Sequence, residues 1–239
     1  MILDSFIFST AGGRDENQDA AGKLEGDGCG LYVVADGLGG HANGRLAAES
    51  VVTTLLNGEK PQSLEELCGG IAAANSAILE LQSRENCTAK STVAALLIRG
   101  ESAFWAHTGD SRIYGIHDGR LTLTTNDHSV SYKKYQSGEI TKRQIAADED
   151  QSRLLKALGG TKRWEPETGT VEGVAPGDAF LLCSDGFWEY VNDEEILVDY
   201  LKASSARQWA RLMLLRAIGR VKPGHDNLTL MTVLVSKGH

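Results

Sequence analysis

Aspartate follows a strongly apolar run at three places in this 239-residue chain, each time next to a glycine. The three are Asp36 after LYVVA, Asp110 after FWAHTG and Asp185 after FLLCS. A fourth, Asp226, comes just before the apolar run NLTLMTVLV. If the last strand is antiparallel to its neighbour, its start lies at the same sheet edge as the ends of the others. One Asp beside Gly is ordinary turn chemistry, but four at matching strand edges favour a shared site.

Carboxylates gathered at one edge of a sheet repel one another. Two unit charges about 4 Å apart repel by about 4 kcal/mol at an effective dielectric constant near 20, so they do not stay ionised together without a counter-charge. A hard divalent cation such as Mg²⁺ or Mn²⁺ supplies that charge, because it prefers carboxylate, carbonyl and water oxygens as ligands. The four aspartates therefore predict a metal centre.

The stretch LYVVADGLGGHANG, residues 31–44, also partly matches a different kind of site. Residues 37–42 fit the pattern G-x-G-x-x-A of dinucleotide-binding folds, and Glu59 lies about 20 residues further on, as that fingerprint asks. The fingerprint requires a parallel βαβ sheet, whereas the elements that follow indicate antiparallel hairpins. The Walker phosphate-binding pattern is missing, since no Gly-Lys-Ser/Thr follows. A metal loop is the favoured interpretation.

Four helices are predicted around these loops. One follows the glycine loop, with apolar positions at 46, 51, 52, 55 and 56. The other three open at capping boxes, in which Ser or Asn is followed three residues later by Glu or Gln. These boxes begin the segments 63–82, 192–203 and 205–219.

Short apolar or alternating runs predict strands at 91–99, 102–109, 179–186 and 227–235. Asp118-Gly119 lies between two alternating segments of residues 112–125, which predicts a β-hairpin. Clustered strands with long helices between them indicate an α+β fold in which helices pack on antiparallel sheets. No repeat or linker divides the chain, so residues 1–239 are expected to form one domain.

Composition excludes several classes of function. The net charge of −8 argues against a nucleic-acid surface, which needs clustered Lys and Arg. The four cysteines show no CxxC spacing, and the N-terminus MILDSFIF lacks the basic start of a secretory signal. Reduced thiols and a cytoplasmic location are therefore expected. No segment approaches the roughly 18 consecutive apolar residues of a membrane span.

Eight segments, in order, resemble the motifs of the PP2C (PPM) metal-dependent protein serine/threonine phosphatases in their compact bacterial form. They are GRDENQD (13–19), VVADGLGGH (33–41), HTGDSRIY (107–114), NDHS (126–129), SGEIT (137–141), LLKALGG (154–160), LLCSDGFWEYV (181–191) and GHDNLT (224–229). The resemblance covers nearly the whole chain. It implies an αββα sandwich, two antiparallel β-sheets flanked by helices, with the metal site at one end. It also implies a monomer that acts on phosphorylated proteins, the targets of a serine/threonine kinase.

The resemblance implies specific metal ligands. Asp36 would bridge two tightly bound Mn²⁺ or Mg²⁺ ions, and the carbonyl of Gly37 would bind the first ion. Asp185 and Asp226 would bind the second ion. Asp110 and Asp185 match the pair that holds a third, weaker ion in bacterial relatives.

Two further residues match the family, and two positions depart from it. Arg14 matches the phosphate-binding arginine, whose planar fork suits a phosphoryl group. Asp19 matches an acid that orients metal-bound water. Leu38 stands where many eukaryotic relatives have a general-acid histidine, and His41 lies three positions later. Lys156 stands where relatives often have arginine, which puts a phosphate contact there in doubt.

This site implies in-line hydrolysis by a metal-activated water, with Arg14, Asp36 and Asp185 as the catalytic groups. No Cys-x₅-Arg segment and no G-x-S-x-G elbow occurs, which argues against a cysteine or serine nucleophile. Two alternatives use the same surface. One is a non-catalytic binding module, and the other is a hydrolase of small phosphoesters or nucleotides.

The segment of about 129–155 is polar and long for a connection, and it matches a flap that lies beside the metals in the family. We expect this flap to select protein substrates. Its cationic side chains at Lys133, Lys134 and Lys142 are the candidates for contact with phosphoproteins.

Overall fold

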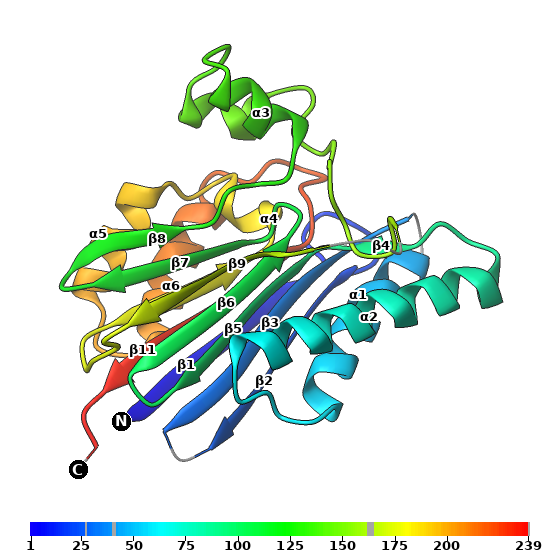
Figure 1. The fold of residues 1–239 in the computed structure, drawn as a ribbon. Helices are drawn as coiled ribbons and strands as arrows, with labels where there is room; N and C mark the ends of the chain where they lie inside the picture. Colours follow the sequence, from blue (N-terminus) through cyan, green and yellow to red (C-terminus); the bar gives the residue numbers. More distant parts are fainter. Residues whose placement is uncertain (27, 40–41, 162–164, 239) are drawn as a thin grey trace.

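Two antiparallel sheets, packed face to face, form the middle of the computed structural model, which describes residues 1–26, 28–39, 42–161 and 165–238 (Figure 1). The first sheet has the order β1-β11-β10-β7-β8. Its strands are β1 (Ile2–Thr10), β11 (Leu228–Ser236), β10 (Ala179–Cys183), β7 (Arg112–His117) and β8 (Arg120–Thr124). The second has the order β2-β3-β5-β6-β9, with the short β4 paired to β3. Its strands are β2 (Asp19–Gly26), β3 (Cys29–Leu38), β4 (Lys90–Ser91), β5 (Val93–Arg99), β6 (Ser102–Thr108) and β9 (Glu167–Glu172).

Helices cover the outer face of each sheet, which confirms the expected αββα sandwich. The helices α1 (Ala42–Asn57) and α2 (Leu64–Glu85) pack on the second sheet. The helices α5 (Asp193–Lys202) and α6 (Ala206–Ile218) pack on the first, after the four-residue helix α4 (Asp185–Trp188). In Figure 1 the cyan and orange helices lie on opposite sides of the strands.

The apolar run that leads to Asp36 is buried on both faces of β3. Leu31 and Val33 pack against α1 and α2, whereas Tyr32 and Val34 pack against the other sheet. Successive side chains of a strand point to opposite faces, so a central strand of a sandwich needs apolar residues at every position. This explains why the run is continuously apolar although its sheet is antiparallel.

The predicted helix starts are confirmed, although the capping boxes differ in detail. At α5, Asn192 accepts a hydrogen bond from the Glu195 N–H (3.0 Å), and the Glu195 carboxylate accepts one from the Asn192 N–H (3.3 Å). At α2, Ser63 accepts from the Glu66 N–H (3.2 Å), but the Glu66 carboxylate binds the N–H of Gln62 instead (2.7 Å). The start of α6 shows the same shift by one residue.

The hairpin of β7 and β8 is also confirmed. Asp118 and Gly119 at its tip have φ angles of 49° and 68°. Positive φ at both central residues is the feature of the type I′ turn, whose twist matches the two strands that it joins.

Three strands were not predicted from the sequence, and all three lie at sheet edges. They are β1, β2 and β9. Most of their residues are only partly buried, and their sequences mix polar and apolar residues without a long apolar run. Edge strands lack a neighbour on one side, so their burial and their apolar pattern are weaker than those of central strands.

The predicted flap stands above one end of the sandwich (Figure 1). It contains the helix α3 (Val130–Gln136) and the 3₁₀-helix η1 (Lys142–Ala147). Backbone hydrogen bonds close its base, from the Leu155 N–H to the His128 carbonyl (2.7 Å) and from the Val130 N–H to the Arg153 carbonyl (2.9 Å).

Candidate metal centre

The acids predicted from the sequence lie together at the end of the sandwich below the flap. The strands β10 and β11 are antiparallel, so the end of β10 and the start of β11 share one edge, as expected. Burial raises the pKa of Asp36 well above its ordinary value, and the negative charges of Asp19, Asp185, Asp110 and Asp226 raise it further. The structure therefore places five carboxylates within electrostatic reach of one another.

Asp19 lies beside Asp36 as its register partner in β2 and β3. The Ser184 hydroxyl donates to Asp19 Oδ2 (2.7 Å). The other oxygen, Oδ1, is buried and has no hydrogen-bond partner in the described part of the chain. Burial raises the pKa of Asp19 to about 7. A buried carboxylate oxygen without a partner is costly unless a cation or a bound water satisfies it.

Asp110 and Asp185 are almost completely buried, with 3% and 8% of their surface exposed. Burial, followed by the charge of Asp226, raises the pKa of Asp185 to about 6. Burial, followed by the charge of Asp185, raises the pKa of Asp110 well above its ordinary value. A Cβ atom at Gly186 would lie 2.0 Å from the carbonyl oxygen of Asn227. Only glycine therefore allows the start of α4 to approach the segment that carries Asp226.

Hydrogen bonds from neighbouring backbone and side-chain groups hold the segments on which these acids lie. The Asp36 N–H donates to Thr92 Oγ1 (2.8 Å), and the Thr92 N–H donates to the Asp36 carbonyl (2.8 Å). The Thr92 hydroxyl also shares a hydrogen bond with the Ser111 hydroxyl (2.6 Å), directly after Asp110. Trp188 Nε1 donates to the Asp110 carbonyl (2.8 Å). The acids are thus held in place by hydrogen bonds of the surrounding strands and turns, and not by contacts with one another.

The loop with Arg14 is attached to the start of β11 through Asn227. The Asn227 amide donates to the carbonyls of Ala11 and Glu16, both at 2.9 Å. Arg14 Nη2 lies 2.8 Å from Asp226 Oδ2, and the two side chains are 55% and 41% exposed. Arg14 therefore lies at the open rim of the acids, where an incoming anion can reach it.

The other predicted positions are Gly37, Leu38, Lys156 and His41. Gly37 is buried, and its N–H donates to the Gln18 carbonyl (3.1 Å). Leu38 is the last residue of β3, and Lys156 is exposed. His41 lies outside the described residues.

Several residues that contact the acids had no predicted role. Arg112 forms a buried, two-pronged ion pair with Asp127 (2.7 and 2.6 Å), and its guanidinium lies 3.6 Å from the ring centroid of Trp188. The flap reaches the acids through Gln151, whose Nε2 donates to Asp185 Oδ2 (3.2 Å). Arg112 and Asp127 lie within motifs recognised in the sequence, whereas no local signal marked Gln151.

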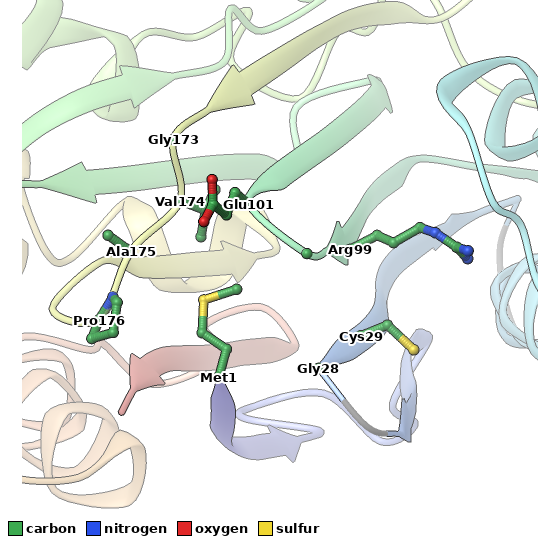
Figure 2. A pocket seen from close by; sticks show the side chains of 10 residues that line it. Met1, Gly28, Cys29, Arg99, Glu101, Gly173, Val174, Ala175 and Pro176 are labelled. Carbon is green, nitrogen blue, oxygen red and sulfur yellow. The ribbon is translucent and has the colours of Figure 1, made fainter. Parts of the chain in front are cut away.

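Two cavities differ in their relation to this centre. A cavity of about 690 Å³ lies at the opposite strand ends, near Met1, Cys29 and Glu101. Figure 2 shows the guanidinium of Arg99 pointing away from Met1, so few polar groups converge there. A groove of about 580 Å³ lies between η1 and α5, next to the acids, and Arg112 is among its lining residues.

The chain matches the family model described as protein phosphatase 2C over residues 11–213. It belongs to the protein phosphatase 2C family. A putative protein phosphatase 2C-type protein of Streptococcus pyogenes serotype M6 is 32% identical over 229 residues, which cover 92% of each chain. Similarity therefore extends well beyond the motifs around the acids.

Solved structures of phosphatase 2C relatives share the whole fold. The crystal structure of the Mycobacterium tuberculosis serine/threonine phosphatase PstP/Ppp superposes with a TM-score of 0.87 at 30% identity, covering 99% of this chain and 100% of that one. A structure of the PstP catalytic domain in complex with two manganese ions gives a TM-score of 0.84 at 30% identity, covering 98% and 99%. In the described part of this phosphatase 2C chain, none of the helices has the length and apolar character needed to cross a membrane.

The crowded acids predict how the metal-free protein responds to pH. A carboxyl whose pKa is raised by folding stabilises the fold while it is protonated, and this contribution is lost as the pH rises through the folded-state pKa. With Asp19 titrating at about pH 7, the free energy of unfolding should fall by about 1 kcal/mol between roughly pH 6.5 and 8 from this residue alone. Urea unfolding with a chelator at both pH values measures it, and added Mn²⁺ should stabilise more at the higher pH.

Asp36→Asn provides the control for this prediction. The amide removes one negative charge from the cluster, so the metal-free variant should be more stable than the wild type at pH 8 and should respond less to Mn²⁺. A variant with the wild-type pH dependence and the wild-type response to Mn²⁺ would show that repulsion at Asp36 does not cause the loss of stability at high pH.

Proposed function

We propose that this chain hydrolyses phosphoserine and phosphothreonine in proteins, using Mn²⁺ or Mg²⁺ held by the carboxylates at the end of the two sheets. The observation that carries the proposal is the convergence of five acids on one rim, with Arg14 as the cation beside them. Family membership and the two manganese ions of the related PstP structure support it.

The chemistry of the acids fits hard divalent ions. Their pKa shifts and the unpartnered Asp19 Oδ1 both indicate negative charge that lacks a counter-charge. In the described part of the chain, no three carboxylates have oxygens within 4.8 Å of one another. Separated carboxylates would suit Mg²⁺, which usually binds through one or two carboxylates and keeps several waters in proteins.

We assign the ligands as the sequence suggested. Asp36 would be shared by two ions, with the Gly37 carbonyl on the first, and Asp185 and Asp226 on the second. Asp110, together with Asp185, would hold a third and weaker ion. When bound, the ions would lower the pKa of a coordinated water and so would supply a nucleophile for phosphorus near neutral pH.

The chain's own residues would bind the phosphoryl group and orient the water. Arg14 can form two parallel hydrogen bonds to phosphoryl oxygens, because its guanidinium is exposed and, among the described residues, pairs within ion-pair distance with Asp226 alone. Asp19 Oδ1 is free to accept a hydrogen bond from a bound water. In a chain of net charge −8, the positive charge of Arg14, together with that of the bound ions, would attract a phosphate.

Wider features of the function are also proposals. The apolar layer between the two sheets is built from both of them, which supports residues 1–239 as one domain. All four cysteines are unpaired, in agreement with the expected cytoplasmic location. We further propose a monomer whose substrates are the targets of a serine/threonine kinase.

Activity assays test the proposed function directly. The protein with millimolar Mn²⁺ should hydrolyse p-nitrophenyl phosphate and a phosphothreonine peptide, and excess chelator should abolish both activities. Binding of a phosphopeptide without turnover would indicate a non-catalytic binding module. Turnover of nucleotides or other small esters, but not of the peptide, would indicate a small-molecule hydrolase.

Asp110→Ala should keep two tightly bound Mn²⁺ ions and lose most turnover of a phosphothreonine peptide. The loss should be smaller for p-nitrophenyl phosphate, whose phenolate leaves without protonation. Calorimetric counting of Mn²⁺, together with rates on both substrates, measures this.

Asp178→Ala is the matched control for Asp110→Ala. Asp178 is also a buried aspartate in a turn, where it accepts from the Ala175 N–H (3.0 Å), but it precedes β10 at the far end of the sandwich. Its loss should lower stability by about 0.5–2 kcal/mol and leave the rates unchanged. Equal rates for Asp110→Ala and the wild type on the peptide would exclude the third-ion role.

The three lysines of the flap that could contact a phosphoprotein differ in their surroundings. Lys142 lines the groove beside the acids and pairs with Asp193 (2.5 Å). Lys134 is held inside the flap by Asp148 and Asp150. Lys133 is exposed and does not line the groove.

Lys142→Ala should therefore raise KM for a phosphoprotein more than for p-nitrophenyl phosphate. Lys133→Ala, the same change on the outside of the flap, should leave both KM values near the wild type. Equal effects of the two variants would mean that the groove does not contact the substrate.

A further inference from the structure

His107, His128 and Glu167 form a cluster next to the metal centre, in which His107 is buried and the other two are partly exposed. The two imidazole rings are stacked, with centroids 4.7 Å apart and planes within 7°. Their Nε2 atoms lie 3.6 and 3.5 Å from the same oxygen, Glu167 Oε2. His107 is fully buried, and neither of its ring nitrogens has a hydrogen-bond partner among the described residues.

The spacing of this cluster resembles a transition-metal site. Ligand atoms about 2.0–2.1 Å from a tetrahedral ion lie roughly 3.3–3.4 Å from one another, close to the two nitrogen-to-oxygen distances. A ligand nitrogen must, however, offer a lone pair to the ion. The hydrogen bonding of His128 decides whether it does.

The proton of His128 faces Glu167. The Gly109 N–H donates to His128 Nδ1 (3.1 Å), so Nδ1 carries the lone pair. Burial lowers the pKa of His128 to about 4, so the ring is neutral at physiological pH. A neutral imidazole has one N–H, and it is therefore on Nε2. The cluster is thus arranged to fix the His128 ring, and not to bind an ion through it.

His128 binds both backbone groups of Gly109. Besides the bond to Nδ1, the His128 N–H donates to the Gly109 carbonyl (2.8 Å). Gly109 is buried, with φ of +100°, and a Cβ atom there would lie 2.6 Å from Thr92 Cγ2. The next residue is Asp110, whose carbonyl is fixed by Trp188. Without Nδ1, the Gly109 N–H would be a buried donor without a partner, which favours a rearranged turn.

We propose that His128 is a positioning residue, whose Nδ1 fixes the Gly109-Asp110 turn and thereby the direction of the Asp110 carboxylate. Glu167 and the stacked His107 hold the ring in the plane that this hydrogen bond needs. The proposal rests on the proposed function, because its consequence is seen in the use of metal ions for turnover.

His128→Asn and His128→Gln form a matched pair of variants. Both are uncharged amides that differ by one methylene. The Asn oxygen stands at the δ position, where it can accept from Gly109, whereas the Gln amide stands one bond further out, where its N–H can donate to Glu167. The measurements are kcat and KM on a phosphothreonine peptide, the Mn²⁺ concentration for half-maximal activity, and the melting temperature.

We expect His128→Gln to lower kcat by about 10- to 100-fold and to raise the half-activating Mn²⁺ concentration, the size of effect seen when a residue that orients a ligand is lost. KM for the peptide should change little. His128→Asn should recover kcat and the Mn²⁺ requirement to within a few-fold of the wild type. The same two changes at His117, a half-exposed histidine that pairs with Asp178 at the far end of β7, should alter neither.

Three results would overturn the proposal. Equal losses in the Asn and Gln variants would mean that ring packing matters and Nδ1 does not. A fully active Gln variant beside an impaired Asn variant would place the role at Nε2 and Glu167. Wild-type values in both would mean that the turn needs no support from this side chain. An inactive wild type, in contrast, would refute the proposed function itself.

Discussion

Repulsion between buried carboxylates is the interaction around which this end of the molecule is organised. Burial raises the pKa of Asp36, Asp110 and Asp185, and the charges of neighbouring acids raise each pKa further. A flexible loop would relieve such repulsion by moving its acids apart. Here the three acids lie at or just after the ends of central strands. The hydrogen bonds between neighbouring strands therefore hold the acids in place. The apolar layers within and around the two sheets supply stabilisation that opposes this repulsion.

Contributions from both sheets meet at this end. Asp36 lies in β3 of one sheet, whereas Asp185 follows β10 and Asp226 precedes β11 of the other. The connections across the sheets are polar and short, such as the bond from Ser184 to Asp19. Because the strands pack through a continuous apolar layer, a shift of one sheet against the other would disturb that layer as well as the acids. The packing of the core therefore also fixes the geometry of the site.

Much of the fold was predictable because its signals are local. The runs ending in Asp36 and Asp185, the Asp118-Gly119 turn and the Asn192 cap each depend on residues within a few positions of one another. The edge strands β1, β2 and β9 were missed because one side of each has no neighbour to require apolar residues. The pairing of Arg112 with Asp127, the contact of Gln151 with Asp185 and the stacking of His107 on His128 were also missed. Each joins positions that only the folded sheet order brings together, so no short-range pattern can report them.

The flap joins the two sheets through a narrow base, so its length and sequence can vary without disturbing the sheets. Backbone hydrogen bonds between residues 128–130 and 153–155 join the two ends of the flap at its base. For a flexible loop whose ends are already fixed, doubling the length costs only about 0.6 kcal/mol of closure entropy. Insertions or deletions between these two ends would therefore alter the surface of the flap. The strand ends below the flap would keep their register. Under the substrate-selecting role that we propose for the flap, changes of specificity there would leave the strand ends that carry the acids in place.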